Sequence, residues 1–113
     1  MPIYGYLLMA SDALLILGAV TMYWFSPRMR RNWVFGYGSP RSMINDAAWQ
    51  SGNRFAGTAL ALLTLVAMFV HVSLWQIIGS SDVAQVLATA SILSLPFFVM
   101  FLTERYLARA FRN

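Results

Sequence analysis

The chain has 113 residues, of which 59% are hydrophobic and 11% are charged, and its formal net charge is +4. Soluble globular domains carry about 25% charged residues, so this composition excludes an ordinary water-soluble fold and indicates a small integral membrane protein. Such an apolar body inserts into lipid before its basic residues meet nucleic acid, so we expect no nucleic-acid partner. The sequence contains no cysteine, which excludes disulfides, thiolate metal ligands and cysteine nucleophiles.

The first predicted membrane span covers residues 3–25, close to the roughly 20 apolar residues that cross the hydrocarbon core. The charged region and cleavage site of a signal peptide are missing from it, so we expect the segment to stay in place as a span. Ser26 and Pro27 should end the helix, because proline disfavours a helical conformation in the residue before it. Three arginines follow, at Arg28, Arg30 and Arg31.

The connection over residues 26–54 mixes aromatic residues, glycines and arginines, unlike the apolar sequence on either side. Ser39 or Ser42 would suit a helix N-cap, with Pro40 in the first turn. The weakly amphipathic pattern after Ser42 predicts a helix at the membrane interface that turns or runs into the second span.

Two further spans are predicted at residues 55–78 and 83–105, joined by a tight turn. Pro96 should kink the third span, and Ser91 and Ser94 are placed to bond the carbonyls that proline leaves free. The predicted fold class is an all-α integral membrane protein with three transmembrane helices and a cytoplasmic interfacial helix between the first two. The whole chain, residues 1–113, is predicted to form a single membrane domain.

The arginines also predict an orientation. Five of the eight lie in the connection between the first two spans and three lie in the C-terminal tail. Basic residues are retained on the cytoplasmic side of a membrane. We therefore expect a multi-pass protein of the bacterial cytoplasmic membrane, with its N-terminus outside and its C-terminus inside.

Polar residues at similar depth in the three spans form a candidate intramembrane site. Asp12 lies in the first span, where an aspartate costs about 2.5–3.5 kcal/mol on insertion scales and so needs a partner or a proton. His71 falls at the same depth in the second span, as do Thr89 and Ser91 in the third. We predict a contact between Asp12 and His71, supported by one of these two hydroxyls. The site is either a proton relay or cation site, or a polar clamp between helices; a further alternative is that Asp12 snorkels to the outer face.

Outside this candidate site, the sequence shows no pattern that indicates catalysis, metal binding or phosphate binding. We detect no Ser-His-Asp spacing, zinc-protease motif, paired acidic metal site or phosphate loop, so we expect a protein that is no enzyme and holds neither metal nor cofactor. Glu104, at the inner end of the third span, is expected to form an interfacial ion pair with Arg28 or Arg54.

The segment from Asn32 to Gly57, followed by a long apolar helix, resembles the SdpI family of small bacterial membrane proteins. The family pattern is Gly-aromatic-Arg-Thr-Pro, a Ser, a Trp, a polar stretch with Asn or His and Arg, and a Gly. The residues that match it are Gly36, Tyr37, Pro40, Ser42, Trp49, Asn53, Arg54 and Gly57. Gly38 and Ser39 stand where the family has its arginine and threonine. The three-span layout is similar to the family's C-terminal module.

The family is typed by an immunity protein that protects a toxin-producing Bacillus cell from its own secreted peptide toxin. The resemblance therefore implies protection against a membrane-active peptide, by binding the peptide or a regulatory protein rather than by catalysis. Two alternatives stay open: an accessory structural subunit of a larger membrane complex, and a small proton-coupled transporter. The expected partners are the lipid bilayer and either further copies of this chain or a larger complex, because three helices bury little surface.

For the motif itself, we expect an interfacial cap on the bundle. Trp33, Tyr37 and Trp49 would anchor at the headgroups, and Arg54 would snorkel or pair where the second helix enters lipid.

Overall fold

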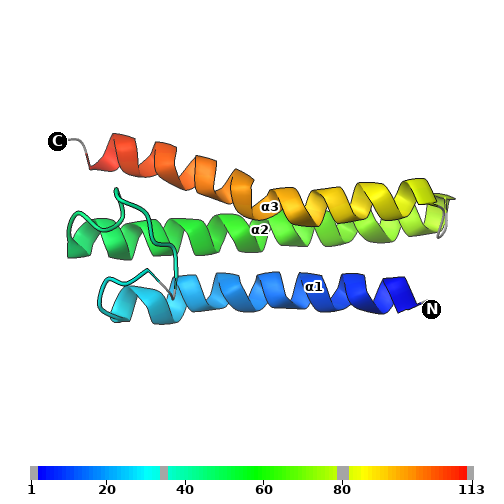
Figure 1. Cartoon of the computed structure of the whole chain (residues 1–113), viewed down its shortest axis with the longest axis horizontal. Helices are drawn as coiled ribbons and strands as arrows, with labels where there is room; N and C mark the ends of the chain where they lie inside the picture. The colour runs from blue at the N-terminus through cyan, green and yellow to red at the C-terminus, as the bar shows by residue number, and fades with distance from the viewer. Residues whose placement is uncertain (1–2, 34–35, 79–81, 112–113) are drawn as a thin grey trace.

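Three long helices lie side by side in the computed structural model of this chain, which describes residues 3–33, 36–78 and 82–111. They are α1 (Ile3–Val20), α2 (Asp46–Ile78) and α3 (Asp82–Ala110). In Figure 1, α2 runs between α1 and α3 and antiparallel to both, and the chain termini lie at opposite ends of the molecule. We call the end that carries residues 26–45 the loop end.

Each helix is long and apolar enough to cross a membrane. The apolar segments are Tyr6–Arg28, Asp46–Leu74 and Gln85–Ala110. Large apolar side chains such as Phe69 and Ile77 are more than 70% exposed, which water would penalise and hydrocarbon would not. The described residues contain no strand. The expected all-α protein with three spans is therefore confirmed.

The first helix continues beyond α1 in altered geometry. A π-helical turn, η1 (Thr21–Phe25), follows α1, and a short 3-10 turn, η2 (Ser26–Arg28), follows η1. Met29 then adopts an extended conformation. The helix thus ends just after Pro27, where the sequence predicted its end, because proline cannot donate the next backbone hydrogen bond.

The sequence predicted an interfacial helix that turns or runs into the second span, and no helix distinct from that span is seen in the described residues. The described residues between η2 and α2 form bends and turns, and α2 then continues without a break from Asp46 through the second span. The cap is Asn45, whose Oδ1 accepts the N–H of Ala48 at 2.7 Å. Ser39 and Ser42 are not the N-cap, because each accepts a backbone N–H of the other, at 3.2 and 2.8 Å, inside an earlier turn.

The backbones of the first two helices meet at Gly57. A methyl group on Gly57 would lie 2.7 Å from the carbonyl oxygen of Ala19 and 2.8 Å from the backbone nitrogen of Tyr23. Ala19, Ala56 and Leu60 are buried around this point, together with Val99 of α3. Small residues let helices approach closely in a membrane, where van der Waals contact replaces the hydrophobic effect as the driving force.

The third helix bends partway along its length (Figure 1), and Pro96 lies inside it. The nearby hydroxyls do not bond the carbonyl of Ile92, whose helical partner Pro96 removes. Instead, Ser91 donates to the carbonyl of Ala88 at 2.8 Å and Ser94 donates to that of Ser91 at 3.0 Å.

Candidate functional site

Asn53 fastens the loop to α2. Its side chain is fully buried, and its Oδ1 accepts the backbone N–H of Tyr37 at 2.6 Å. Its Nδ2 donates to the carbonyl of Tyr37 at 3.3 Å and to that of Trp49 at 2.9 Å. One amide therefore pairs with both polar backbone groups of Tyr37, as a neighbouring strand would do.

Gly36 is the point at which this loop passes closest to the helices. Its φ is +88°, the only positive φ in the described residues, and a methyl group there would collide with Asn53 Oδ1 and Ser26 Oγ. Both the conformation and the lack of space require glycine at this position.

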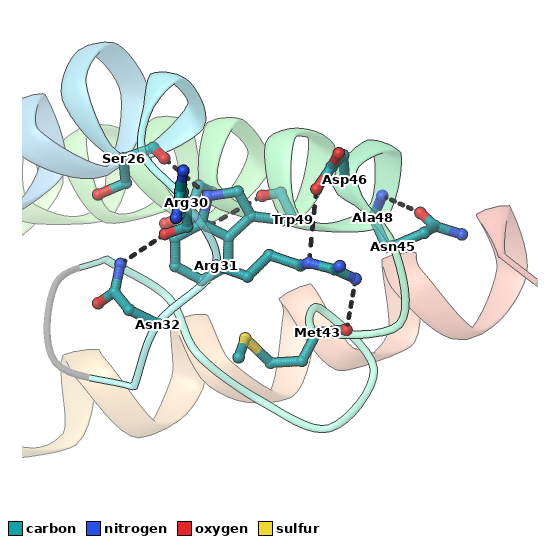
Figure 2. Close-up of polar contacts among 10 residues, drawn as sticks. Ser26, Arg30, Arg31, Asn32, Met43, Asn45, Asp46, Ala48 and Trp49 are labelled. Atoms are coloured by element: carbon teal, nitrogen blue, oxygen red, sulfur yellow. Dashed lines mark hydrogen bonds and ion pairs between the residues drawn. The ribbon is translucent and has the colours of Figure 1, made fainter.

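Ser42 and Trp49 add further hydrogen bonds, within the loop and between α2 and the first helix. The Ser42 hydroxyl is buried, accepts the N–H of Ser39 at 2.8 Å and lies 3.0 Å from the carbonyl of Ser39. The Trp49 indole N–H donates to the carbonyl of Ser26 at 2.7 Å, which ties α2 to the end of the first helix (Figure 2). Trp49 is only 1% exposed, so it packs inside the protein rather than at the headgroups as the sequence suggested.

A third set of contacts joins the loop to α3. The Tyr37 hydroxyl donates to Glu104 Oε1 at 2.6 Å and lies 3.2 Å from the carbonyl of Met100. Arg41 Nε lies 3.5 Å from Glu104 Oε2. Glu104 thus pairs with Arg41 of the loop and not with Arg28 or Arg54 as expected, because the loop folds back across α2 to reach α3.

Burial, and then the hydrogen bond to Glu104 and its negative charge, raise the pKa of the Tyr37 hydroxyl above its ordinary value. The hydroxyl therefore stays protonated at neutral pH and remains a donor to the carboxylate.

The structure brings most of the predicted motif together. Gly36, Tyr37, Ser42, Trp49 and Asn53 form a connected set, and Gly57 seats α2 against the first helix one turn further on. Pro40 and Arg54 are exposed. The arrangement closes the loop end of the bundle, because it links the first helix, α2 and α3 through one loop.

Three polar side chains, one from each span, are also in contact: Asp12, His71 and Ser91. His71 Nδ1 lies 3.3 Å from Asp12 Oδ2, and His71 Nε2 lies 2.8 Å from Ser91 Oγ. Asp12 is 5% exposed and His71 is 7% exposed. The hydroxyl at His71 is that of Ser91, whereas Thr89 occupies an exposed position on α3.

This cluster can accommodate the histidine in two protonation states. A neutral His71 with its proton on Nδ1 donates to Asp12 and accepts from Ser91. A protonated His71 donates from both ring nitrogens, and Ser91 then donates to the carbonyl of Ala88. Asp12 Oδ1 is buried without a hydrogen-bond partner among the described residues, so the carboxylate keeps an open acceptor position.

The order of contacts is that of a hydrolytic triad, but the surroundings do not suit one. Ser91 lies within α3, where the backbone N–H groups around it are engaged in helical hydrogen bonds and are not free to bind an oxyanion. The contacts shown are those of a buried polar cluster that joins the three spans through Asp12, His71 and Ser91.

These features define a polytopic helical membrane protein with a structured loop at one end and a buried polar cluster in its spans. The model of the SdpI/YfhL protein family matches residues 28–103. Because the match covers more than half of the chain, this protein belongs to the SdpI/YfhL family. The matched region contains the loop, α2 and most of α3, with His71 and Ser91, and it leaves out Asp12. Searches of curated proteins and of solved structures return no match.

Proposed function

We propose that this chain protects a bacterial cytoplasmic membrane against a membrane-active peptide, by binding that peptide rather than by chemistry. The observation that carries the proposal is the family match over residues 28–103, together with the use of the motif residues within it. The polar groups of Tyr37 and Asn53 form the hydrogen bonds that hold the loop to the helices. They therefore support a preformed binding surface rather than a reactive centre.

An apolar groove beside the motif offers such a surface. It lies between η1 and α2, has a volume of about 270 Å³, and is lined by residues that include Ala19, Tyr23, Trp24, Gly57, Ala61 and Leu62. Tyr23, Trp24 and Leu62 are exposed, so the groove opens to the surrounding lipid. A helical apolar peptide dissolved in the bilayer would pack there against small side chains.

The test is survival of bacteria that express the chain and are exposed to a panel of membrane-permeabilising peptides, including the Bacillus toxin counteracted by the family's typing immunity protein. Cells that express the native chain or the Ala13→Phe variant should survive better than cells without the chain. Ala13→Phe is the control, because it adds a ring at an exposed position of α1. Ala61→Phe fills the groove and should abolish the gain. Equal survival with and without the native chain would contradict protection, and equal protection by both variants would exclude the groove.

The proposal also includes the orientation of the chain in the membrane. With the N-terminus outside and the C-terminus inside, the loop faces the cytoplasm. The chain has no cysteine, so single cysteines report location cleanly. A membrane-impermeant thiol reagent should label Tyr6→Cys in intact cells and label Arg109→Cys only after lysis; the reverse pattern would overturn the orientation.

Proton-coupled transport is a second candidate, favoured by the buried contact of His71 with Asp12 and Ser91. Asp12→Asn keeps the shape of the side chain and removes its charge. If the cluster relays protons, the variant should assemble normally and lose proton flux in liposomes. Unchanged flux and assembly would end this candidate and leave a polar clamp.

The role of an accessory subunit makes a different prediction, since it requires large partners in a fixed ratio. A mild-detergent purification with mass spectrometry should, on our proposal, yield only copies of this chain. Stoichiometric recovery of large membrane subunits would favour the accessory role.

A further inference from the structure

A basic depression lies at the loop end, beside the start of α2. Its volume is about 320 Å³, and it is bounded on one side by the chain that leaves η2 and on the other by the first turns of α2. The lining residues that matter here are Arg28, Arg30, Asp46, Trp49, Gln50 and Arg54. No motif contact described above uses the three arginines.

The charge of this depression is strongly positive. Its one carboxylate, Asp46, lies 3.4 Å from Arg31 Nε, and Arg31 also donates to the carbonyl of Met43 at 2.9 Å (Figure 2). The negative charge of Asp46 is therefore already offset by an arginine outside the depression. Arg28, Arg30 and Arg54 remain as an excess of positive charge.

Two features of the surroundings strengthen the attraction for an anion. Asp46 is the first residue of α2, so the positive end of a long helix dipole lies at the depression. The Arg28 guanidinium lies 5.3 Å from the centre of the Trp24 ring, a contact that holds the side chain beside an exposed aromatic residue.

The depth of the depression matches the headgroup layer. At about 1.5 Å per residue, the 33 residues of α2 extend well beyond the ~30 Å hydrocarbon core and cover the ~40–45 Å that includes the headgroups. The first turns of α2 and the exposed Trp24 therefore lie where lipid phosphates are found.

We propose that this depression binds the phosphate of an anionic phospholipid headgroup, with Arg28, Arg30 and Arg54 as its ligands. Guanidinium groups match phosphate oxygens in pairs of parallel hydrogen bonds. Gln50 carries an amide that can bond a headgroup hydroxyl, as in phosphatidylglycerol. A lipid held here would bridge the chain after η2 and the first turns of α2, and so fasten the loop end to the membrane surface.

The test compares two double variants that remove the same charge at the same end of the bundle. Arg30→Gln with Arg54→Gln alters the depression, and Arg105→Gln with Arg109→Gln alters α3. The purified proteins in mixed micelles are titrated with phosphatidylglycerol against phosphatidylcholine, and bound lipid is counted by native mass spectrometry. A hydrogen bond to a charged group contributes about 1.5 kcal/mol or more, which is about tenfold in affinity, so the first variant should bind phosphatidylglycerol about 100-fold more weakly. The second variant, whose arginines lie outside the depression, should lose much less.

Equal weakening in both variants, or in neither, would overturn the site. A separate titration with inorganic phosphate distinguishes the source of the phosphate group. We expect inorganic phosphate not to displace phosphatidylglycerol, and displacement would identify a site for free phosphate instead. Unaltered circular dichroism of the variants shows that a loss of binding does not come from unfolding.

Discussion

At the scale of single residues, the loop depends on side chains that replace backbone partners. Tyr37 lies outside any helix, so its backbone N–H and carbonyl need partners elsewhere, and Asn53 supplies both. This explains why an amide, with a donor and an acceptor on one side chain, occupies a fully buried position in α2.

Asn53→Ala should therefore destabilise the protein by about 2–4 kcal/mol, because it removes three hydrogen bonds and leaves the buried N–H of Tyr37 without its acceptor. Gln50→Ala is the matched control, since Gln50 is exposed on the preceding turn of α2. Reversible unfolding in detergent, followed by tryptophan fluorescence, measures both variants. Equal stabilities would show that the loop is not held by Asn53.

Tyr37 gives the structure a defined response to alkaline pH. Its pKa is raised in the folded protein above an ordinary value of about 10, so the folded state holds the proton more tightly than the unfolded state. Its contribution to stability is fully present below pH ~10 and is lost as the pH rises through the folded-state pKa.

In the Tyr37→Phe variant, we expect lower stability at pH 8 and a flatter decline above pH 10 than in the native protein. Denaturant unfolding at a series of pH values measures this difference. Parallel declines in the two proteins would contradict the link between Tyr37 and Glu104.

Some residue contacts could be predicted from the sequence and others could not. The depth of each polar residue in a span follows from the helical rise, so counting was enough to place Asp12 near His71. The bond between Tyr37 and Glu104 joins residues 67 positions apart, through a loop without periodic structure. No pattern specifies that path. Trp49 was assigned to the interface because an amphipathic ring suits both a headgroup layer and a buried position with a hydrogen-bond acceptor.

At the scale of the elements, helix length and composition predicted the three spans, whereas the start of α2 was not predictable. Ser39, Ser42 and Asn45 are all residue types that favour an N-cap. Asn45 caps α2, because the hydroxyls of the two serines accept each other's backbone N–H groups in an earlier turn. With the cap at Asn45, the residues of the predicted interfacial helix from Asp46 onward form the first turns of α2.

The packing of α2 against the first helix depends on the absence of a side chain at Gly57. Gly57→Ala should destabilise the bundle by about 1–3 kcal/mol, since the added methyl group would force two backbones apart. Gly18→Ala is the control, because a methyl group there would meet only Leu60 Cδ2, at 3.9 Å. Thermal unfolding in detergent should separate the two variants, and similar melting temperatures would contradict the close approach.

At the scale of the whole molecule, the bundle combines two parts with different demands. The loop end is held by buried hydrogen bonds between loop and helices, and the spans present apolar side chains to their surroundings while they enclose the cluster of Asp12, His71 and Ser91. The groove that we propose as the peptide-binding surface lies beside this loop end, between η1 and α2.

The most direct test of this account is equilibrium binding of a fluorescently labelled membrane-active peptide, the Bacillus toxin used in the survival test, to nanodiscs that contain the chain and to empty nanodiscs of the same lipid. The account predicts saturable binding to the loaded discs, beyond the partitioning into empty discs, with a stoichiometry set by the number of chains. Identical, unsaturated partitioning into both kinds of disc would contradict it.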